Sequence, residues 1–500
     1  MSEISKSKYN PVFIILLCSI FLLVIMQPWN LYFLNDDFEH IPVSGNILLV
    51  TKNFLRPVAN RFLFIDKHLY NKQAAGYFFT TWLLHAACTA GVYLVSLQVI
   101  KKYTLDLPAY TALLTALFFL FYPFHAESLF WIIARGSVIA ALFAIMSLYF
   151  YLKKNENYSH LLIALLFFVA ALFTYESIWN VLFFYCVISF YNIKKKSSAL
   201  EKECFHAGIF VLTFLLYLLV RLFSLDTLTG GYTEIDTNIF KVPLLLANLL
   251  KLVARNFTPP FHNTVFSIIF FSSSVIVFVL AMLLMFKKDK STGWLMVILW
   301  LGVISGVITA APLGIDTHGN ESERYIYYSS FFFCFFLAAI ITLIKKKEWK
   351  YIITGFIIVS EITGLIVYNA HYRYTSAVVK KSLELIRKYP EYKNVYFIDV
   401  PGEYKGALIF RACLPNAIRW IASECKYDSV IIISQTEDAS GILPYQKGEK
   451  TWMEFSREKR FQEQTKQYAV KDTLGRNILL NENDAVFWFA KKGLYKVRRP

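Results

Sequence analysis

The spacing of its long apolar runs limits the possible folds of this chain more than any other feature. A helix that spans a membrane needs about 20 mostly apolar residues, and we predict about eleven such spans. They lie at 11–33, 76–100, 107–124, 128–152, 159–175, 177–193, 205–225, 264–286, 293–313, 325–344 and 351–370. A soluble chain with 56% hydrophobic residues could not bury this surface in one core. We therefore predict an α-helical polytopic membrane protein.

Lysines gather at every second break between these runs. They are Lys6, Lys8, Lys101, Lys102, Lys153, Lys154, Lys194, Lys195, Lys196, Lys287, Lys288, Lys290, Lys345, Lys346, Lys347 and Lys350. Because cytoplasmic loops carry an excess of Lys and Arg, the alternation predicts that all these breaks are cytoplasmic. The same clusters supply much of the net charge of +16, and their distribution argues against a groove for nucleic acid.

The remaining breaks must then face outward, and they carry acidic and histidine side chains. These breaks include residues 35–39, 124–127, 175–177, 226–236 and 316–324, the last with His318 and Glu321. The first outer loop, about 34–75, is long. We predict short helices at the membrane interface for residues 45–55, 60–71 and 239–255, where apolar and basic residues alternate.

The texture of the sequence changes after residue 371. Residues 379–389 have the pattern of an amphipathic helix, while 394–400, 428–434 and 485–490 have that of strands. We therefore divide the chain into a transmembrane domain, 1–370, and a soluble α/β domain, 371–500. An odd number of spans predicts that this second domain is extracytoplasmic, where Cys413 and Cys425 could form a disulfide.

Several acidic groups would meet at one depth on the outer face. Asp36 and Asp37 directly follow the first span, His125 and Glu127 end the third, and Glu176 lies between the fifth and sixth. Taken singly, each is equally well explained as a solvated loop residue or a helix cap. Taken together, they suit a general base acting on a hydroxyl, with a second acid positioning the acceptor or a cation.

Arginines near the outer ends of spans supply the positive charge that a phosphate would need. Arg135, Arg221 and Arg324 are the candidates, because guanidinium groups fit phosphate oxygens. Arg324 could instead pair with Glu321 or Glu323. Snorkelling, or a structural pair with Glu127, explains Arg135 nearly as well.

A set of motifs in a fixed order resembles the GT-C superfamily of membrane glycosyltransferases, and in particular the protein O-mannosyltransferases. The motifs are Asn35-Asp36-Asp37-Phe38, Arg56-Pro57, Thr80-Thr81-Trp82-Leu83-Leu84-His85, Tyr122-Pro123-Phe124-His125-Ala126-Glu127-Ser128, Ala134-Arg135-Gly136, Tyr175-Glu176-Ser177, Tyr217 with Arg221, and Glu323-Arg324-Tyr325-Ile326-Tyr327. The resemblance covers about residues 10–345.

This resemblance implies roles for individual residues. It maps the leading catalytic acid of the family to Asp36, with Asp37 close behind. It assigns His125, Glu127, Glu323, Arg324 and Tyr325 to substrate binding, beside Arg135, Glu176 and Arg221. The chain departs from the family in two places, because relatives often have an acid where Ser137 stands and a lysine where Tyr175 stands. It also lacks the tetratricopeptide repeats of one related subfamily.

The resemblance implies transfer of a sugar from a polyprenyl-phosphate or dolichyl-phosphate donor to a hydroxyl on a protein, lipid or glycan. Some relatives use a divalent cation, and the sequence does not decide whether this chain does. We expect a bacterial inner membrane with the site facing the periplasm. The alternatives are a transporter or flippase of lipid-linked glycans, whose ionisable groups would lie near mid-membrane, and a polymerase or ligase of surface polysaccharide.

Overall fold

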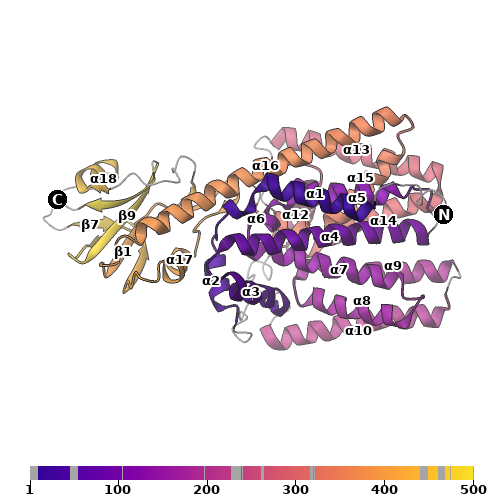
Figure 1. The fold of residues 1–500 in the computed structure, drawn as a ribbon, viewed down its shortest axis with the longest axis horizontal. Coiled ribbons are helices and arrows are strands. Elements are labelled where there is room, and N and C mark those ends of the chain that lie inside the picture. The colour runs from indigo at the N-terminus through magenta and orange to yellow at the C-terminus, as the bar shows by residue number, and fades with distance from the viewer. Residues whose placement is uncertain are drawn as a thin grey trace.

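The computed structural model describes residues 10–45, 54–103, 105–195, 198–226, 238, 240–260, 264–315, 319, 321–439, 449–459, 468–472, 474–491 and 493–498. These residues form a helical domain and a small α/β domain, which one long helix joins (Figure 1). The predicted fold class is confirmed.

Every predicted span contains a helix. These helices are α1 (Pro11–Met26), α4 (Ala74–Lys102), α5 (Tyr110–Phe121), α7 (Gly136–Leu152), α8 (Tyr158–Leu172), α9 (Val181–Lys194), α10 (Leu200–Leu225), α13 (Thr264–Lys288), α14 (Lys290–Val307), α15 (Ser329–Thr342) and α16 (Lys347–Ile386). Of the helices in the described ranges, 7 are long and apolar enough to cross a membrane unaided. The segment 123–130, which contains α6 (Ala126–Phe130), bends by 54° from α5, so this pair is a broken span or a re-entrant loop.

Polar caps at the breaks explain where several of these helices begin. The side chains of Asn10, Asn157 and Asp289 each accept a backbone N–H in the first turn of the helix that follows. Such a cap satisfies a donor that has no partner within the helix and contributes about 1 kcal/mol.

Contacts between the breaks show that two of the lysine clusters lie at the same end of the helical domain. The Lys102 ammonium at the end of α4 donates to the carbonyl of Leu152 at the end of α7. Lys154, just after α7, forms a buried ion pair with Glu203 in the first turn of α10, with Nζ 2.6 Å from Oε2. The ends of α4 and α7 and the start of α10 therefore lie together, as the alternation of charge predicted.

The opposite end carries short helices and turns. They are α2 (Asp37–Val43), α3 (Pro57–Tyr70), α12 (Val242–Arg255) and the 3₁₀ turns η2 (Pro28–Asn30), η3 (Pro123–His125), η4 (Ile133–Arg135), η5 (Glu176–Ile178), η6 (Ile308–Ala310) and η7 (Glu323–Ile326). Figure 1 shows α2 and α3 at the end of the bundle nearer the α/β domain. The helices predicted at 60–71 and 239–255 correspond to α3 and α12, while 46–53 lie outside the described residues.

The α/β domain contains the three strands that the sequence predicted. Its larger sheet has the order β4-β1-β9-β10-β6, in which β1 runs parallel to both β4 and β9. The elements are β1 (Asn394–Ile398), β2 (Val400–Tyr404), β3 (Ala407–Leu408), α17 (Leu414–Ile421), β4 (Ser429–Ile432), β5 (Gln435–Asp438), β6 (Glu449–Thr451), α18 (Trp452–Lys459), β7 (Ala469–Lys471), β8 (Asn477–Leu479), β9 (Asp484–Ala490) and β10 (Gly493–Arg498).

Helix α16 runs unbroken past residue 371 and carries the chain from one domain into the other (Figure 1). The amphipathic helix predicted at 379–389 is its last part. Cys413 and Cys425, which could pair by sequence alone, are separate buried thiols. The Cys413 sulfur lies near the Asp36 carboxylate, and the Cys425 thiol donates to the carbonyl of Ile386.

Candidate active site

The two aspartates after α1 occupy different environments. Asp37 is fully buried: its Oδ2 accepts the backbone N–H of Leu34 at 2.9 Å, and its Oδ1 accepts that of Ile133 at 3.0 Å. Asp37 therefore ties the loop after α1 to the turn before α7. Asp36 instead forms part of the wall of a polar cavity of about 350 Å³. The sequence treated them as a pair, whereas the structure separates them.

The polar cavity opens among the first outer loop, α3, the turn before α7 and η7. Its charged and polar lining residues are Asp36, His40, Arg56, Asn60, Tyr175 and Arg324. Burial raises the pKa of Asp36, although the nearby His40 and Arg324 act in the opposite direction. A partly buried carboxylate with a raised pKa is a stronger base than a solvated one.

Glu176 joins two arginines that come from distant parts of the chain. Its Oε2 accepts Nη2 and Nε of Arg56 at 2.7 and 3.0 Å, and its Oε1 accepts Nη1 of Arg221 at 2.9 Å. Burial raises the pKa of Glu176, but the two guanidinium groups outweigh burial and hold it below its usual range. One carboxylate thus orients two guanidinium groups, and both of them line an apolar groove.

An apolar groove of about 620 Å³ lies beside the polar cavity. Its apolar walls come from α10, α12 and the segment after α14, with Leu218, Leu245, Leu249 and Leu313 among them. Arg56 and Tyr175 line both the groove and the polar cavity, while Glu176, Arg221 and Tyr325 line the groove. The two spaces therefore meet at a cluster of guanidinium groups.

Arg324 faces the polar cavity and is held by Glu127. Its backbone N–H donates to Oε2 of Glu127 at 2.7 Å, and its guanidinium forms an ion pair with Oε1 of the same carboxylate. Its Nε also donates to the Tyr175 hydroxyl at 3.3 Å and its Nη2 to the Tyr325 hydroxyl at 3.1 Å. The segment that holds η7 is thereby fixed against α6.

The two acids that the sequence offered as partners of Arg324 bind other arginines. Oε1 of the fully buried Glu323 lies 2.8 Å from Nη1 of Arg255 on α12, which also donates to the carbonyl of Gly319. Glu321 pairs with Arg411 of the α/β domain at 2.6 Å. Glu323 therefore anchors α12 and lines neither cavity. His318 lies outside the described residues.

Two further candidates lie away from both cavities. Nε2 of the fully buried His125 is 2.7 Å from the Ser330 hydroxyl, and the His125 ring packs on that of Tyr327. Arg135, also buried, pairs with Asp66 of α3 and not with Glu127, the structural partner that the sequence suggested. Both residues line neither the polar cavity nor the apolar groove.

The α/β domain closes one side of the site. The carbonyl of Ile409 accepts the backbone N–H of Asn35 at 2.9 Å, and the Cys413 sulfur is 3.7 Å from Oδ1 of Asp36. The Trp420 ring also packs on Phe33, with centroids 4.9 Å apart. Asn35 has a positive φ of 39°, a conformation that asparagine tolerates better than most residues. The loop that carries Asp36 is thus held by both domains.

Arg56 and Tyr175 are the site residues that sequence reasoning missed. Arg56 counted there only as part of a motif, and Tyr175 as a departure from the family pattern. The guanidinium of Arg56 stacks on the Tyr175 ring, 4.2 Å from its centroid. An arginine directly before Pro57 at a helix start was the available signal. Among the described residues, no group of 3 or more His, Cys, Asp or Glu side chains could hold a metal ion.

Comparisons with known proteins gave a match only among solved structures. No family model and no curated protein matches the chain. The chain is similar to the archaeal oligosaccharyltransferase AglB from Archaeoglobus fulgidus in complex with an inhibitory peptide and a dolichol-phosphate, with 12% identity and a TM-score of 0.48 over 84% of this chain. The apo form of the Archaeoglobus fulgidus oligosaccharyltransferase gives 12% identity and a TM-score of 0.49 over 85% of this chain. The chain spans 64% and 65% of the length of these two structures.

Proposed function

We propose that this chain is a GT-C-type membrane glycosyltransferase. It would move a sugar from a polyprenyl-phosphate or dolichyl-phosphate donor to a hydroxyl of a protein, lipid or glycan. One observation carries the proposal: a polar cavity walled by Asp36 and an apolar groove share Arg56 and Tyr175. A lipid-linked sugar has the same three parts in the same order, namely a polar sugar, an anionic phosphate and a long apolar chain.

The apolar groove suits the donor's prenyl chain. This prenyl chain would pass from the bilayer into van der Waals contact with Leu245 and Leu249, without exposure to water. The phosphate then lies beside Arg56 and Arg221, whose forks are oriented by Glu176. Arg324, which lines the polar cavity, approaches the same phosphate from the sugar side. This arrangement puts the anomeric carbon at the mouth of the polar cavity.

Asp36 is the proposed general base. The acceptor oxygen attacks the anomeric carbon and gives its proton to the Asp36 carboxylate, while the bond between that carbon and the phosphate oxygen breaks. The electron pair leaves with the polyprenyl phosphate, where the arginines stabilise the growing negative charge. Asp37, with both oxygens occupied by backbone N–H groups, would position the loop. Arg135 and His125 would act on packing around the site.

The orientation of the chain in the membrane would follow from the charges at the two ends of the helical domain. The lysine clusters would face the cytoplasm, so the site and the α/β domain would lie on the outer face. In a bacterium this is the periplasmic side of the inner membrane.

The test uses the purified full-length chain in detergent with a panel of undecaprenyl-phosphate monosaccharides. Release of undecaprenyl phosphate, measured by mass spectrometry, is the readout common to every sugar and acceptor. We expect release with at least one donor in the presence of a membrane extract that supplies acceptors, and none with Asp36→Asn. With the chain reconstituted in liposomes, movement of labelled donor between the two leaflets without release of undecaprenyl phosphate would favour the flippase and would refute the transferase.

A further inference from the structure

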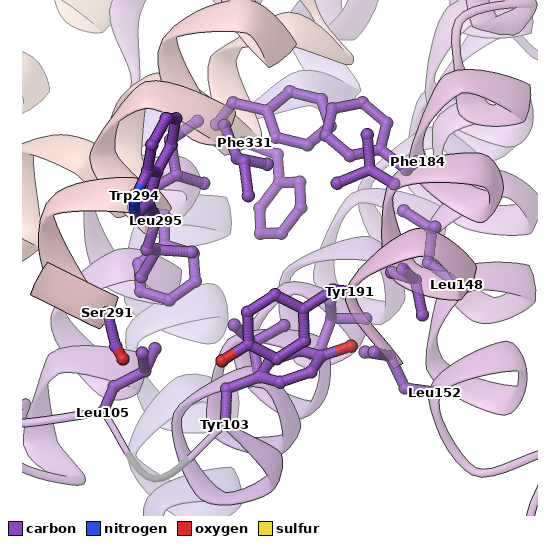
Figure 2. A pocket seen from close by; sticks show the side chains of 18 residues that line it. Tyr103, Leu105, Leu148, Leu152, Phe184, Tyr191, Ser291, Trp294, Leu295 and Phe331 are labelled. Atoms are coloured by element: carbon purple, nitrogen blue, oxygen red, sulfur yellow. The ribbon is translucent and has the colours of Figure 1, made fainter. Parts of the chain in front are cut away.

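A second pair of cavities lies at the other end of the helical domain, among the lysine clusters. One is an apolar slot of about 100 Å³ between α9 and α14, walled by α4, α7 and α15 (Figure 2). The other is a polar cavity of about 480 Å³ that contains Lys101, Lys102 and Lys195. Tyr103, Leu152 and Tyr191 line both, so the slot and the basic cavity adjoin at these three side chains.

The basic cavity keeps an excess of positive charge. Its three lysines face one carboxylate, Glu156, which lies 3.9 Å from the ammonium of Lys153. Lys102 donates one hydrogen bond to the carbonyl of Leu152, and Lys195 lies over the Tyr191 ring. Among the residues that the structure describes, no carboxylate forms an ion pair with any of the three lysines that line this cavity. Orientation alone would require lysines at this break, but not a cavity around them.

A buried hydroxyl marks the junction of the two spaces. The Tyr103 and Tyr191 rings cross edge to face at the end of the slot, with centroids 4.8 Å apart (Figure 2). The Tyr103 hydroxyl is buried and meets no hydrogen-bond partner in the described part of the chain. A buried donor without an acceptor costs about 1–3 kcal/mol, which a ligand oxygen at this junction would offset.

We propose that these cavities bind one anionic phospholipid, separately from the donor site. Its phosphate lies among Lys101, Lys102 and Lys195 and accepts a hydrogen bond from the Tyr103 hydroxyl. One of its acyl chains enters the slot between α9 and α14. The slot walls carry almost only apolar side chains, among them Val187, Ile298 and Phe335. Basic pockets between helices on the cytoplasmic side bind anionic headgroups, and each lysine contributes about a fivefold gain in affinity.

The experiment is native mass spectrometry of the delipidated full-length chain titrated with phosphatidylglycerol, phosphatidylcholine or sodium phosphate. The wild type should bind one phosphatidylglycerol more tightly than phosphatidylcholine. Lys101→Gln with Lys195→Gln should weaken it about 25-fold. Tyr103→Phe, which removes one oxygen and little else, should weaken it several-fold. The matched control, Lys345→Gln with Lys346→Gln, removes equal charge from exposed lysines that line neither cavity and should bind as the wild type does.

Two results would overturn the proposal. One is equal binding of phosphatidylglycerol by the wild type, the double variant and Tyr103→Phe. The other concerns Ile188→Trp, which fills the slot. If this variant binds both phosphate and phosphatidylglycerol as the wild type does, the slot holds no acyl chain. That second result would assign the cavity to a free anion. None of these measurements depends on transferase activity.

Discussion

The variants Asp36→Asn and Asp37→Asn should impair different properties of the protein. Removing a general base lowers the rate of a proton-coupled step by about 10²- to 10⁴-fold. We expect Asp36→Asn to lose transfer activity by this factor. Its unfolding temperature should stay nearly unchanged, because Asp36 lies on a cavity wall. Asp37→Asn should instead lower stability, while its folded fraction keeps most of its transfer rate.

The size of the Asp37→Asn effect follows from its hydrogen bonds. Both carboxylate oxygens accept a backbone N–H, from Leu34 and from Ile133. An asparagine amide offers one oxygen, so its NH₂ group would face the other N–H and leave it without an acceptor. A buried N–H in that state costs about 1–3 kcal/mol. Thermal unfolding in detergent, followed by tryptophan fluorescence, should show the loss in Asp37→Asn only.

The two aspartates should also give opposite pH dependences, one of the transfer rate and the other of the stability. Burial raises the pKa of Asp36, and transfer needs its ionised form, so the rate should fall with decreasing pH from above the usual aspartate range. Burial raises the pKa of Asp37 from 3.8 to about 8. The folded state thus holds the Asp37 proton more tightly than the unfolded state does, and this contribution to stability falls as pH rises from about 4 and is gone above about 8.

Comparing the two variants tests this reasoning directly. Full transfer by Asp36→Asn would remove the base assignment. An equal decrease of the unfolding temperature in both variants would show that Asp36 and Asp37 contribute alike to stability, and would contradict the distinction between them. The dependence of unfolding temperature on pH between 6 and 9 should weaken in Asp37→Asn, and an unchanged dependence would contradict the role of Asp37.

Three further predictions concern the groove, the cluster beside it and the basic end. Leu249→Trp should raise the KM for an undecaprenyl donor about tenfold, but not for a short-chain analogue, because the larger side chain narrows the apolar groove. Arg56→Lys keeps the charge but loses the planar fork that binds Glu176, so we expect kcat to fall and the donor KM to rise, with kcat/KM at least about tenfold lower. Glu203→Gln leaves the buried Lys154 ammonium uncompensated and should destabilise the chain by about 3–5 kcal/mol in thermal unfolding, and much of this should return in the double variant Lys154→Met with Glu203→Leu.

The spans could be predicted because hydropathy is a local property. Each run of about 20 apolar residues must form a helix in a bilayer, whatever its neighbours do. The lysine alternation predicted which helix ends lie on the same side of the membrane. The contacts of Lys102 and Lys154 agree with this prediction. The strands of the α/β domain were also visible, since their apolar residues stand together between polar turns.

The partners of the charged residues could not be predicted, because they depend on helix packing between distant segments. Arg135 binds Asp66 on α3, a residue that the sequence gave no reason to select. Asp37 differs from its neighbour because it accepts the backbone N–H of Leu34 and that of Ile133, which comes from a distant turn. Nothing in the order Asp-Asp specifies which carboxylate reaches the cavity. Glu323 and Glu127 likewise pair with arginines other than those expected, Arg255 and Arg324, because of where α12 and α6 pack.

These pairings determine the charge that a donor phosphate would meet. Glu176 holds Arg56 and Arg221, and Glu127 holds Arg324, so three guanidinium groups are fixed around the two cavities. The departing phosphate monoester gains further negative charge as the bond to the sugar breaks, as monoesters do at neutral pH. In the proposed reaction, fixed guanidinium groups would therefore interact more strongly with the transition state than with the bound donor, which is the condition for raising kcat and not only affinity.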